Sequence, residues 1–153
     1  MTSPARNDLP TIEDESRPFW EAAKEHRFVI ARCRSCGRAH HYPRPFCPFC
    51  WSEDVNWEDA SGRATLYTYS TVYVNDLFPF RDELPYVAAV VDLDEGPRVM
   101  TRLVGVPEAD LAVGMPVVVD FQQVTDDLTV PVFRSAATAP SDTAQSDTAP
   151  SDH

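Results

Sequence analysis

Lysine is almost absent from this chain of 153 residues, because Lys24 is the only one and the other twelve basic residues are arginine. The 24 acidic residues outnumber the 13 basic ones and give a formal net charge of −11. Tight binding to nucleic-acid phosphates needs clustered Lys and Arg. The charge balance therefore argues against a general nucleic-acid binder.

Long apolar runs are missing as well. No window approaches the roughly 20 apolar residues that a membrane-spanning helix needs. The opening stretch, MTSPARNDLPTIEDES, has no basic segment followed by an apolar one, so we expect no signal peptide. The expected location is the cytoplasm, where paired cysteines are more often metal ligands than disulfides.

Familiar catalytic signatures are not found either. The sequence has no nucleophile elbow, phosphate-binding loop, dinucleotide fingerprint or zinc-protease motif. Its Asp and Glu residues are scattered rather than paired. The hydrophobic fraction of 43% suits a globular domain with a modest core. We therefore expect a folded protein without independent catalysis.

The four cysteines are the most specific signal. They form two C-x2-C pairs separated by ten residues, namely Cys33, Cys36, Cys47 and Cys50. A two-residue gap in a tight turn lets both thiolates face one ion about 2.3 Å away. Gly37 can supply the left-handed backbone that such a turn needs, and Pro48 stiffens the second turn. This spacing predicts one structural zinc ion held by four thiolates, with no position left for water.

Other occupants of the cysteine site remain open. Iron uses the same four-thiolate ligand set and is the next candidate after zinc. Two disulfides or a redox pair are further alternatives. His40 and His41 lie between the two pairs, and replacement of one cysteine ligand by a histidine is a further alternative. We expect both histidines to be solvated, because four cysteines already complete the site.

Secondary structure is predicted as one helix followed mainly by strands. Ser16 and Pro18 favour a helix start, so a helix is expected over 18–26 and a short strand over 28–31. The later strands are expected at 64–74, 84–93, 98–104, 115–124 and 129–133, with a helical turn near 106–111. Five strands with this connection suggest a small Greek-key barrel of the OB type, and a β-sandwich competes with it.

These elements predict four regions. Residues 1–15 are expected to be a disordered arm, and 16–57 the N-terminal helix and zinc ribbon. Residues 58–134 are expected to form the OB-fold, and 135–153 a disordered acidic tail rich in Ala, Ser, Thr, Asp and Pro.

An ordered series of short motifs between residues 16 and 134 resembles one known family. The motifs are Pro18-Phe19-Trp20, Cys33-Arg34-Ser35-Cys36-Gly37, Tyr42-Pro43, Cys47-Pro48-Phe49-Cys50, Gly62-Arg63, Pro85-Tyr86-Val87, Leu93-Asp94-Glu95-Gly96-Pro97, Gly114-Met115-Pro116-Val117 and Pro131-Val132-Phe133. The family joins a rubredoxin-like zinc ribbon to an OB-fold and associates with acyl-CoA enzymes. One departure is His26-Arg27-Phe28, where the family commonly has a glycine followed by an apolar residue.

The resemblance implies a mainly β protein with an N-terminal helix, a rubredoxin-like zinc ribbon and a five-stranded OB-fold barrel. It also implies an accessory role. Members resembling this chain support thiolase-superfamily enzymes that carry out acyl transfer or retro-aldol cleavage on acyl-CoA thioesters, including those of steroid side chains. The partner supplies the catalytic residues, and the zinc-ribbon subunit can help to bind the CoA ester. We therefore expect a thiolase-like partner, encoded nearby, and acyl-CoA as a ligand of the complex.

Two surface features are candidates for contact with CoA or a partner. Five arginines, Arg27, Arg32, Arg34, Arg38 and Arg44, fall in a stretch with no acidic residue between positions 26 and 52. They are candidates for binding phosphates or an acidic patch, and a solvated ribbon surface is the alternative. Phe78 and Phe80 lie in a long loop over 75–83, where they either cover the barrel mouth or dock a partner.

A nucleic-acid-binding zinc-ribbon/OB module is the alternative function, because both folds serve that role elsewhere. Tyr67, Tyr69 and Tyr73 share one parity in the sequence, which places them on one face of the expected strand. There they would stack on bases or pack across strands. The acidic charge opposes nucleic-acid binding.

Overall fold

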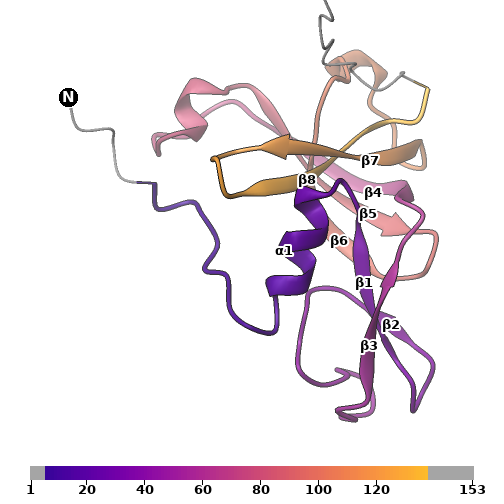
Figure 1. The fold of residues 1–153 in the computed structure, drawn as a ribbon. Helices are drawn as coiled ribbons and strands as arrows, with labels where there is room; N and C mark the ends of the chain where they lie inside the picture. Colours follow the sequence, from indigo (N-terminus) through magenta and orange to yellow (C-terminus); the bar gives the residue numbers. More distant parts are fainter. Residues whose placement is uncertain (1–5, 138–153) are drawn as a thin grey trace, which may run out of the picture.

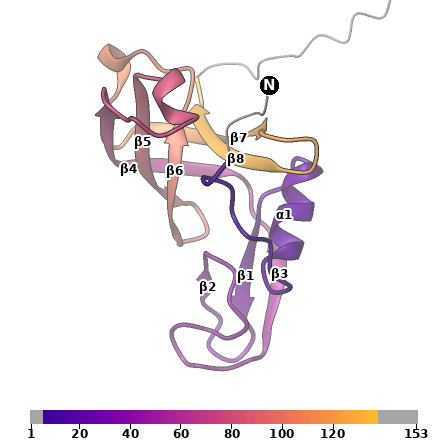
Figure 2. The ribbon, with the colours of Figure 1, turned by 90° about the vertical axis from the view of Figure 1, so that its left-hand side faces the viewer.

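A computed structural model describes residues 6–137, in which a small three-stranded sheet and a closed five-stranded barrel are joined through one α-helix (Figure 1). The sheet forms one end of the molecule and the barrel the other, with the helix between them (Figures 1 and 2). The expected mainly β fold is confirmed.

Helix α1 spans Arg17–Lys24 and buries Phe19, Trp20, Ala22 and Ala23. Ser16 occupies the N-cap position, but its side chain does not cap the helix. Its hydroxyl instead accepts the backbone N–H of Glu13 at 3.1 Å. The serine thus stabilises the turn that precedes the helix.

The C-terminal end of α1 explains the departure from the family pattern. His26 adopts a φ of 57°, the left-handed conformation that glycine adopts without strain. The N–H groups of His26 and Arg27 donate to the carbonyls of Ala23 and Ala22, at 3.0 and 2.9 Å. The imidazole of His26 stacks on Phe121, with ring centroids 5.1 Å apart. His26 therefore adopts the left-handed conformation for which the family pattern has a glycine.

The small sheet consists of β1 (Val29–Cys33), β2 (Ala39–His40) and β3 (Val55–Asp59), in the order β2-β1-β3. Both neighbours run antiparallel to β1. The central strand leads directly into the first cysteine, so the sheet fixes where the cysteine turns begin. The sequence signal predicts β1 but neither β2 nor β3, because these strands are short or polar.

The barrel contains β4 (Arg63–Val72), β5 (Tyr86–Leu93), β6 (Arg98–Leu103), β7 (Pro116–Gln123) and β8 (Thr129–Ser135). They close in the order β4-β5-β6-β8-β7, and β4 pairs with β7. All pairs are antiparallel except β6 with β8. The short 3-10 helices η1 (Phe80–Asp82) and η2 (Glu108–Asp110) lie in the connections. This closed Greek-key order is that of an OB-fold, so the sandwich alternative is wrong.

A β-bulge in β4 changes which way the tyrosines face. Leu66 pairs with Val91 and Thr68 with Val90, so Tyr67 is the extra residue. An extra residue shifts the alternation of side chains by one position. Tyr67 is exposed, whereas Tyr69 packs against the core. The expectation that the strand tyrosines share one face is therefore wrong.

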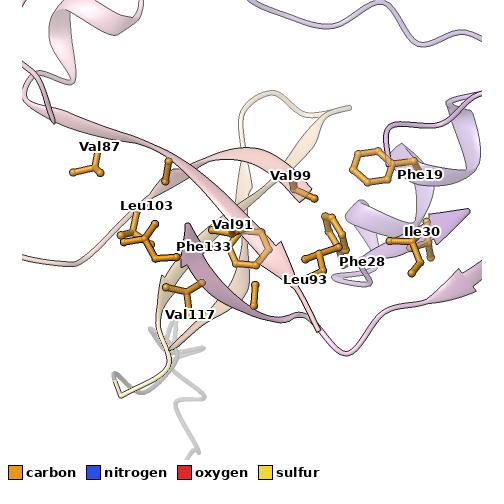
Figure 3. Close-up of a cluster of buried hydrophobic side chains, with 14 of the residues drawn as sticks. Phe19, Phe28, Ile30, Val87, Val91, Leu93, Val99, Leu103, Val117 and Phe133 are labelled. Atoms are coloured by element: carbon orange, nitrogen blue, oxygen red, sulfur yellow. The ribbon is translucent and has the colours of Figure 1, made fainter. Parts of the chain in front are cut away.

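The hydrophobic core is continuous from α1 into the barrel. Phe28 lies at the junction, with its ring centroid 5.7 Å from Phe19 of the helix and 6.1 Å from Phe133 of β8. Figure 3 shows Phe28 between Phe19 on one side and Leu93 with the barrel residues on the other. Ribbon and barrel are thus packed around shared side chains.

The segment before α1 also contacts this core. Leu9 and Ile12, which belong to the expected arm, pack against it. Residues 1–5 of the arm, and residues 138–153 of the expected tail, are outside the described range. Among residues 6–137, no helix is both long enough and apolar enough to cross a membrane.

Candidate metal centre and surrounding surface

The four cysteine sulfurs converge at the end of the ribbon. All four Sγ atoms lie within 4.8 Å of one another. Cys33 Sγ is 3.6 Å from Cys50 Sγ, and Cys36 Sγ is 3.7 Å from Cys47 Sγ. A disulfide would need about 2.05 Å, whereas the edge of a tetrahedron with 2.3 Å metal–sulfur bonds is about 3.8 Å. The cluster fits a tetrahedral metal ion and not a pair of disulfides.

The first cysteine turn is held by backbone hydrogen bonds. The N–H of Cys33 donates to the carbonyl of Arg38, and the N–H of Gly37 donates to the carbonyl of Cys33, both at 2.9 Å. Gly37 has a φ of 77°, as its position in the sequence predicts. The N–H of Cys36 lies 3.5 Å from Cys33 Sγ and stabilises negative charge on the sulfur.

The second turn repeats this arrangement without a glycine. The N–H of Cys47 donates to the carbonyl of Ser52 at 2.8 Å, and the N–H of Trp51 donates to the carbonyl of Cys47 at 2.9 Å. Trp51 takes the place of Gly37, with a φ of 66°. Its ring stacks on Phe46, with centroids 5.2 Å apart. Sequence reasoning misses this residue because tryptophan is not a signal for left-handed backbone.

The thiols influence one another strongly. The N–H of Cys36 is the main cause that lowers the pKa of the Cys33 thiol to about 6. At Cys50 the N–H of Ser52 acts to lower the pKa, but desolvation and the neighbouring thiols outweigh it and raise the pKa to about 12. Four thiolates this close need a compensating positive charge. The residues present thus suit a closed metal site.

His40 and His41 are not solvated, so that expectation is wrong. His40 is only 4% exposed, and neither of its ring nitrogens has a hydrogen-bond partner in the described part of the chain. Burial lowers the pKa of His41 to about 4, with a smaller contribution from His40. The ring of His41 packs against both Phe19 and Phe28, with ring centroids 5.3 and 5.7 Å away. His40 is therefore buried and His41 half-buried, which their polarity in the sequence hides.

Acidic residues of β3 neutralise part of the expected arginine cluster. Arg32 binds Glu58 through two hydrogen bonds of 2.7 and 2.8 Å, which lower the pKa of that carboxyl. Arg27 bonds Asp59 at 2.7 Å. The acidic residues come from beyond position 52, and the β1–β3 pairing brings them beside the arginines. Much of the positive charge that a nucleic-acid face would need is therefore compensated.

The remaining ribbon arginines are more exposed. Arg34 lies 3.7 Å from Asp54. The guanidinium of Arg38 lies over the ring of Phe49, 3.6 Å from its centroid. Arg44 is exposed, and within residues 6–137 it has no acidic partner. Arg38 and Arg44 are thus the arginines of the cluster whose charge is least compensated.

Phe78 and Phe80 lie far from these arginines. Their loop and the cysteine end of the ribbon are at opposite ends of the molecule (Figures 1 and 2). Both rings are half-buried: Arg6 lies 5.8 Å from the ring of Phe78, and Phe80 packs near Tyr86. Leu77 is the most exposed apolar residue of this loop, at 69%. The structure does not bring the two expected contact features together.

Comparison with known proteins agrees with this architecture. A family model described as "ChsH2, rubredoxin-like zinc ribbon domain" matches residues 20–56, and one described as "ChsH2, C-terminal OB-fold domain" matches residues 57–122. A solved structure titled "Ltp2-ChsH2(DUF35) aldolase" contains a chain that is 41% identical, with a TM-score of 0.76. The match covers 84% of this chain and 99% of that one.

Three curated relatives carry informative names. The "Probable enoyl-CoA hydratase alpha subunit" of Thermomonospora curvata is 41% identical over 83% of this chain, which spans only 39% of that relative. A "DUF35 domain-containing scaffold protein" of Methanocaldococcus jannaschii is 33% identical over 71% of this chain and 77% of the relative. The "Benzoylsuccinyl-CoA thiolase subunit BbsA" of Geobacter metallireducens is 34% identical over 48% of each chain. The chain therefore belongs to the DUF35 family, in which a ChsH2-type rubredoxin-like zinc ribbon precedes an OB-fold.

Proposed function

We propose that this chain is a non-catalytic subunit that binds and supports a thiolase-superfamily enzyme acting on acyl-CoA thioesters. The observation that carries the proposal is the match over 99% of a chain from the Ltp2-ChsH2(DUF35) aldolase structure. Relatives named as a scaffold protein and as a thiolase subunit point the same way. The partner supplies the reacting groups for acyl transfer or retro-aldol cleavage, and this chain supplies a rigid surface.

The composition of the metal site supports a non-catalytic role. Catalytic zinc keeps one coordination position for water, whereas four cysteines fill all positions of a tetrahedral ion. In residues 6–137, these cysteines form the only group of three or more His, Cys, Asp or Glu ligands close enough to share an ion. Residues 6–137 thus offer four ligands for a structural ion and no second group that could form an open metal site.

We propose zinc, with Cys33, Cys36, Cys47 and Cys50 as its ligands. The purified protein should contain about one zinc per chain by elemental analysis. Cys36→Ser should lose the metal and lower the melting temperature, whereas Ser35→Ala in the same turn should keep both. Iron in place of zinc would overturn the choice of metal, and full stability without any metal would overturn the structural role.

The accessory role is tested by reconstitution with the thiolase-like protein encoded beside this chain. Each protein and their equimolar mixture are assayed with acyl-CoA substrates, and binding is measured by size-exclusion chromatography with light scattering. We expect a stable complex, and activity only in the mixture. Turnover of an acyl-CoA by this chain alone, or failure to bind such a partner, would contradict the proposal.

Among the arginines, we propose that Arg38 and Arg44 are the ones that assist with CoA, because they lack acidic partners among the described residues. Arg44→Gln should raise the KM for acyl-CoA in the mixture and leave kcat unchanged. Arg32→Gln serves as the control, because the charge of Arg32 is already compensated by Glu58. An unchanged KM in Arg44→Gln and in Arg38→Gln would remove this part of the proposal.

A further inference from the structure

An apolar hollow lies where α1, the segment around His41 and the barrel strands β6 and β8 meet. Its volume is about 190 Å³. The walls are mostly aromatic: they include Phe19, Trp20, Phe28, Tyr42 and Phe133. A dry cavity of about 150 Å³ accepts one benzene ring, whereas pockets for drug-sized ligands have about 300 Å³ or more. The hollow therefore has room for one aromatic ring and not for an acyl-CoA.

The hollow carries no formal charge at neutral pH. His41, one of its lining residues, is neutral there because burial lowers the pKa of the imidazole to about 4. Its Nδ1 atom is buried and has no hydrogen-bond partner in the described structure. The Trp20 indole is already engaged, since Nε1 donates to the Tyr42 hydroxyl at 3.1 Å. Because Nδ1 is buried, Nε2 is the imidazole nitrogen left to bond a group that enters the hollow.

The hollow continues onto the outer face of the barrel. A second, shallow hollow of about 230 Å³ lies over β4, β5 and β6, and it shares Met100 and Thr101 with the first. Its surface is made of small or apolar side chains, among them Ala88 and Val90. Met100 stands between the two hollows with 86% of its surface exposed. The flexible thioether of an exposed methionine adapts readily to the shape of a partner.

Charged pairs border this face on two sides. Arg98 binds Asp92 at 2.6 Å and stacks on Tyr67, 3.5 Å from its ring centroid. At the other end Arg102 binds Glu83. An apolar centre with a polar, charge-balanced rim is the usual anatomy of a protein–protein interface. Because the charges of the rim are paired with one another, the apolar centre of this face suits an uncharged surface on a partner.

The undescribed parts of this chain offer no suitable occupant. Residues 138–153 contain no Phe, Tyr, Trp, Leu, Ile, Val or Met, and residues 1–5 contain only Met1 as a large apolar residue. Neither of these two segments therefore offers an aromatic anchor for the hollow. A ring with a polar tip, such as Tyr or Trp, would fill the hollow and pair with the imidazole.

We propose that the partner enzyme docks on this surface, which consists of the outer face of β4, β5 and β6 together with the hollow beside His41. One aromatic side chain of the partner occupies the hollow, and its polar tip bonds the His41 imidazole. This inference rests on the proposed function, because it names the surface through which that partner is bound. It moves the main contact away from the loop of Phe78 and Phe80.

Two substitutions test the surface without disturbing the core. Met100→Glu places a charge at the centre of the face, and its binding to the reconstituted partner should weaken by about 30-fold or more. His41→Phe keeps the aromatic packing but removes the nitrogens, and should weaken binding about 10-fold. Val113→Glu is the matched control, because Val113 is 68% exposed and lies outside both hollows. Leu77→Glu tests the loop that competes as a docking site.

Affinities are measured by calorimetry with the partner protein encoded beside this chain, after circular dichroism and metal analysis have shown each variant to be folded. Weakening by Met100→Glu and His41→Phe, with Val113→Glu and Leu77→Glu within about twofold of wild type, supports the proposal. Wild-type affinity in Met100→Glu, or a loss confined to Leu77→Glu, overturns it and leaves the proposed function intact. A wild-type chain that binds no partner instead overturns the proposed function. Self-association that Met100→Glu abolishes would assign the face to a second copy of this chain and refute the inference.

Discussion

Replacing His41 by phenylalanine should reduce the acid sensitivity of the protein's stability. In the folded protein the imidazole packs against Phe19 and Phe28, and burial lowers its pKa from 6.5 to about 4. The unfolded chain takes up a proton near pH 6.5, whereas the folded chain resists it until about pH 4. Stability is therefore fully present above pH 6.5 and falls as the pH decreases through this window.

The size of the effect follows from the two pKa values. For one site that titrates near 6.5 when unfolded and near 4 when folded, the linkage relation gives a loss of about 2 kcal/mol at pH 5 relative to pH 7.5. His41→Phe removes this contribution. At pH 7.5 the variant should be as stable as wild type or more so, because it also removes a buried nitrogen without a partner.

Urea unfolding followed by tryptophan fluorescence between pH 5 and 7.5 measures this difference. Metal loss at low pH affects both proteins, so the difference between their stability curves isolates His41. Tyr42→Phe, which changes the neighbouring ring but keeps the imidazole, should retain the wild-type pH dependence. Parallel curves for wild type and His41→Phe would refute the burial argument.

Two further predictions concern turns and charges. Gly62→Ala should destabilise the protein more than Gly37→Ala, because both glycines have a left-handed φ but only the new Cβ at Gly62 would lie 2.5 Å from Val119 Cγ1. The left-handed conformation costs a non-glycine residue about 1–2 kcal/mol, and overpacking adds about 1–3 kcal/mol, so equal losses in thermal unfolding would contradict this. Arg32→Gln should cost at most about 1 kcal/mol, because its ion pair with Glu58 is about one-third exposed. Since the bond to Arg32 lowers the carboxyl pKa, the loss in urea unfolding should be largest above pH 4.5 and shrink below it; a loss independent of pH would argue against the ion pair.

The barrel and the cluster of four cysteines can both be predicted from the sequence, because both leave local signals. Alternating β-formers mark β4 to β8, and the paired cysteines mark the four sulfurs that converge at the ribbon end. Gly37 is found for the same reason, since a left-handed turn favours glycine. These features depend on short-range spacing, which a single sequence displays directly.

Features that depend on distant pairing cannot be predicted in this way. The burial of His41 arises from Phe19 and Phe28, which approach it only after α1 packs beside the ribbon. The neutralisation of Arg32 needs Glu58, 26 residues away along the chain. The bulge at Tyr67 shifts the alternation of inward and outward side chains along β4, and no residue type in the sequence signals it. In each case the partner is set by topology rather than by neighbours in the sequence.

The strand β3 also bears on how such a protein can be inherited and engineered. The two family models meet between residues 56 and 57, in the middle of this strand, where Asn56 and Trp57 pair with Arg32 and Ala31 of β1. A recombination event or a truncation at that point would split the ladder and uncover Phe28, whose ring also contacts the barrel. We therefore expect the ribbon and the barrel to be inherited together. Fusion to another domain should preserve the fold only where the junction lies outside the packed segment, which begins near Leu9 and ends with β8.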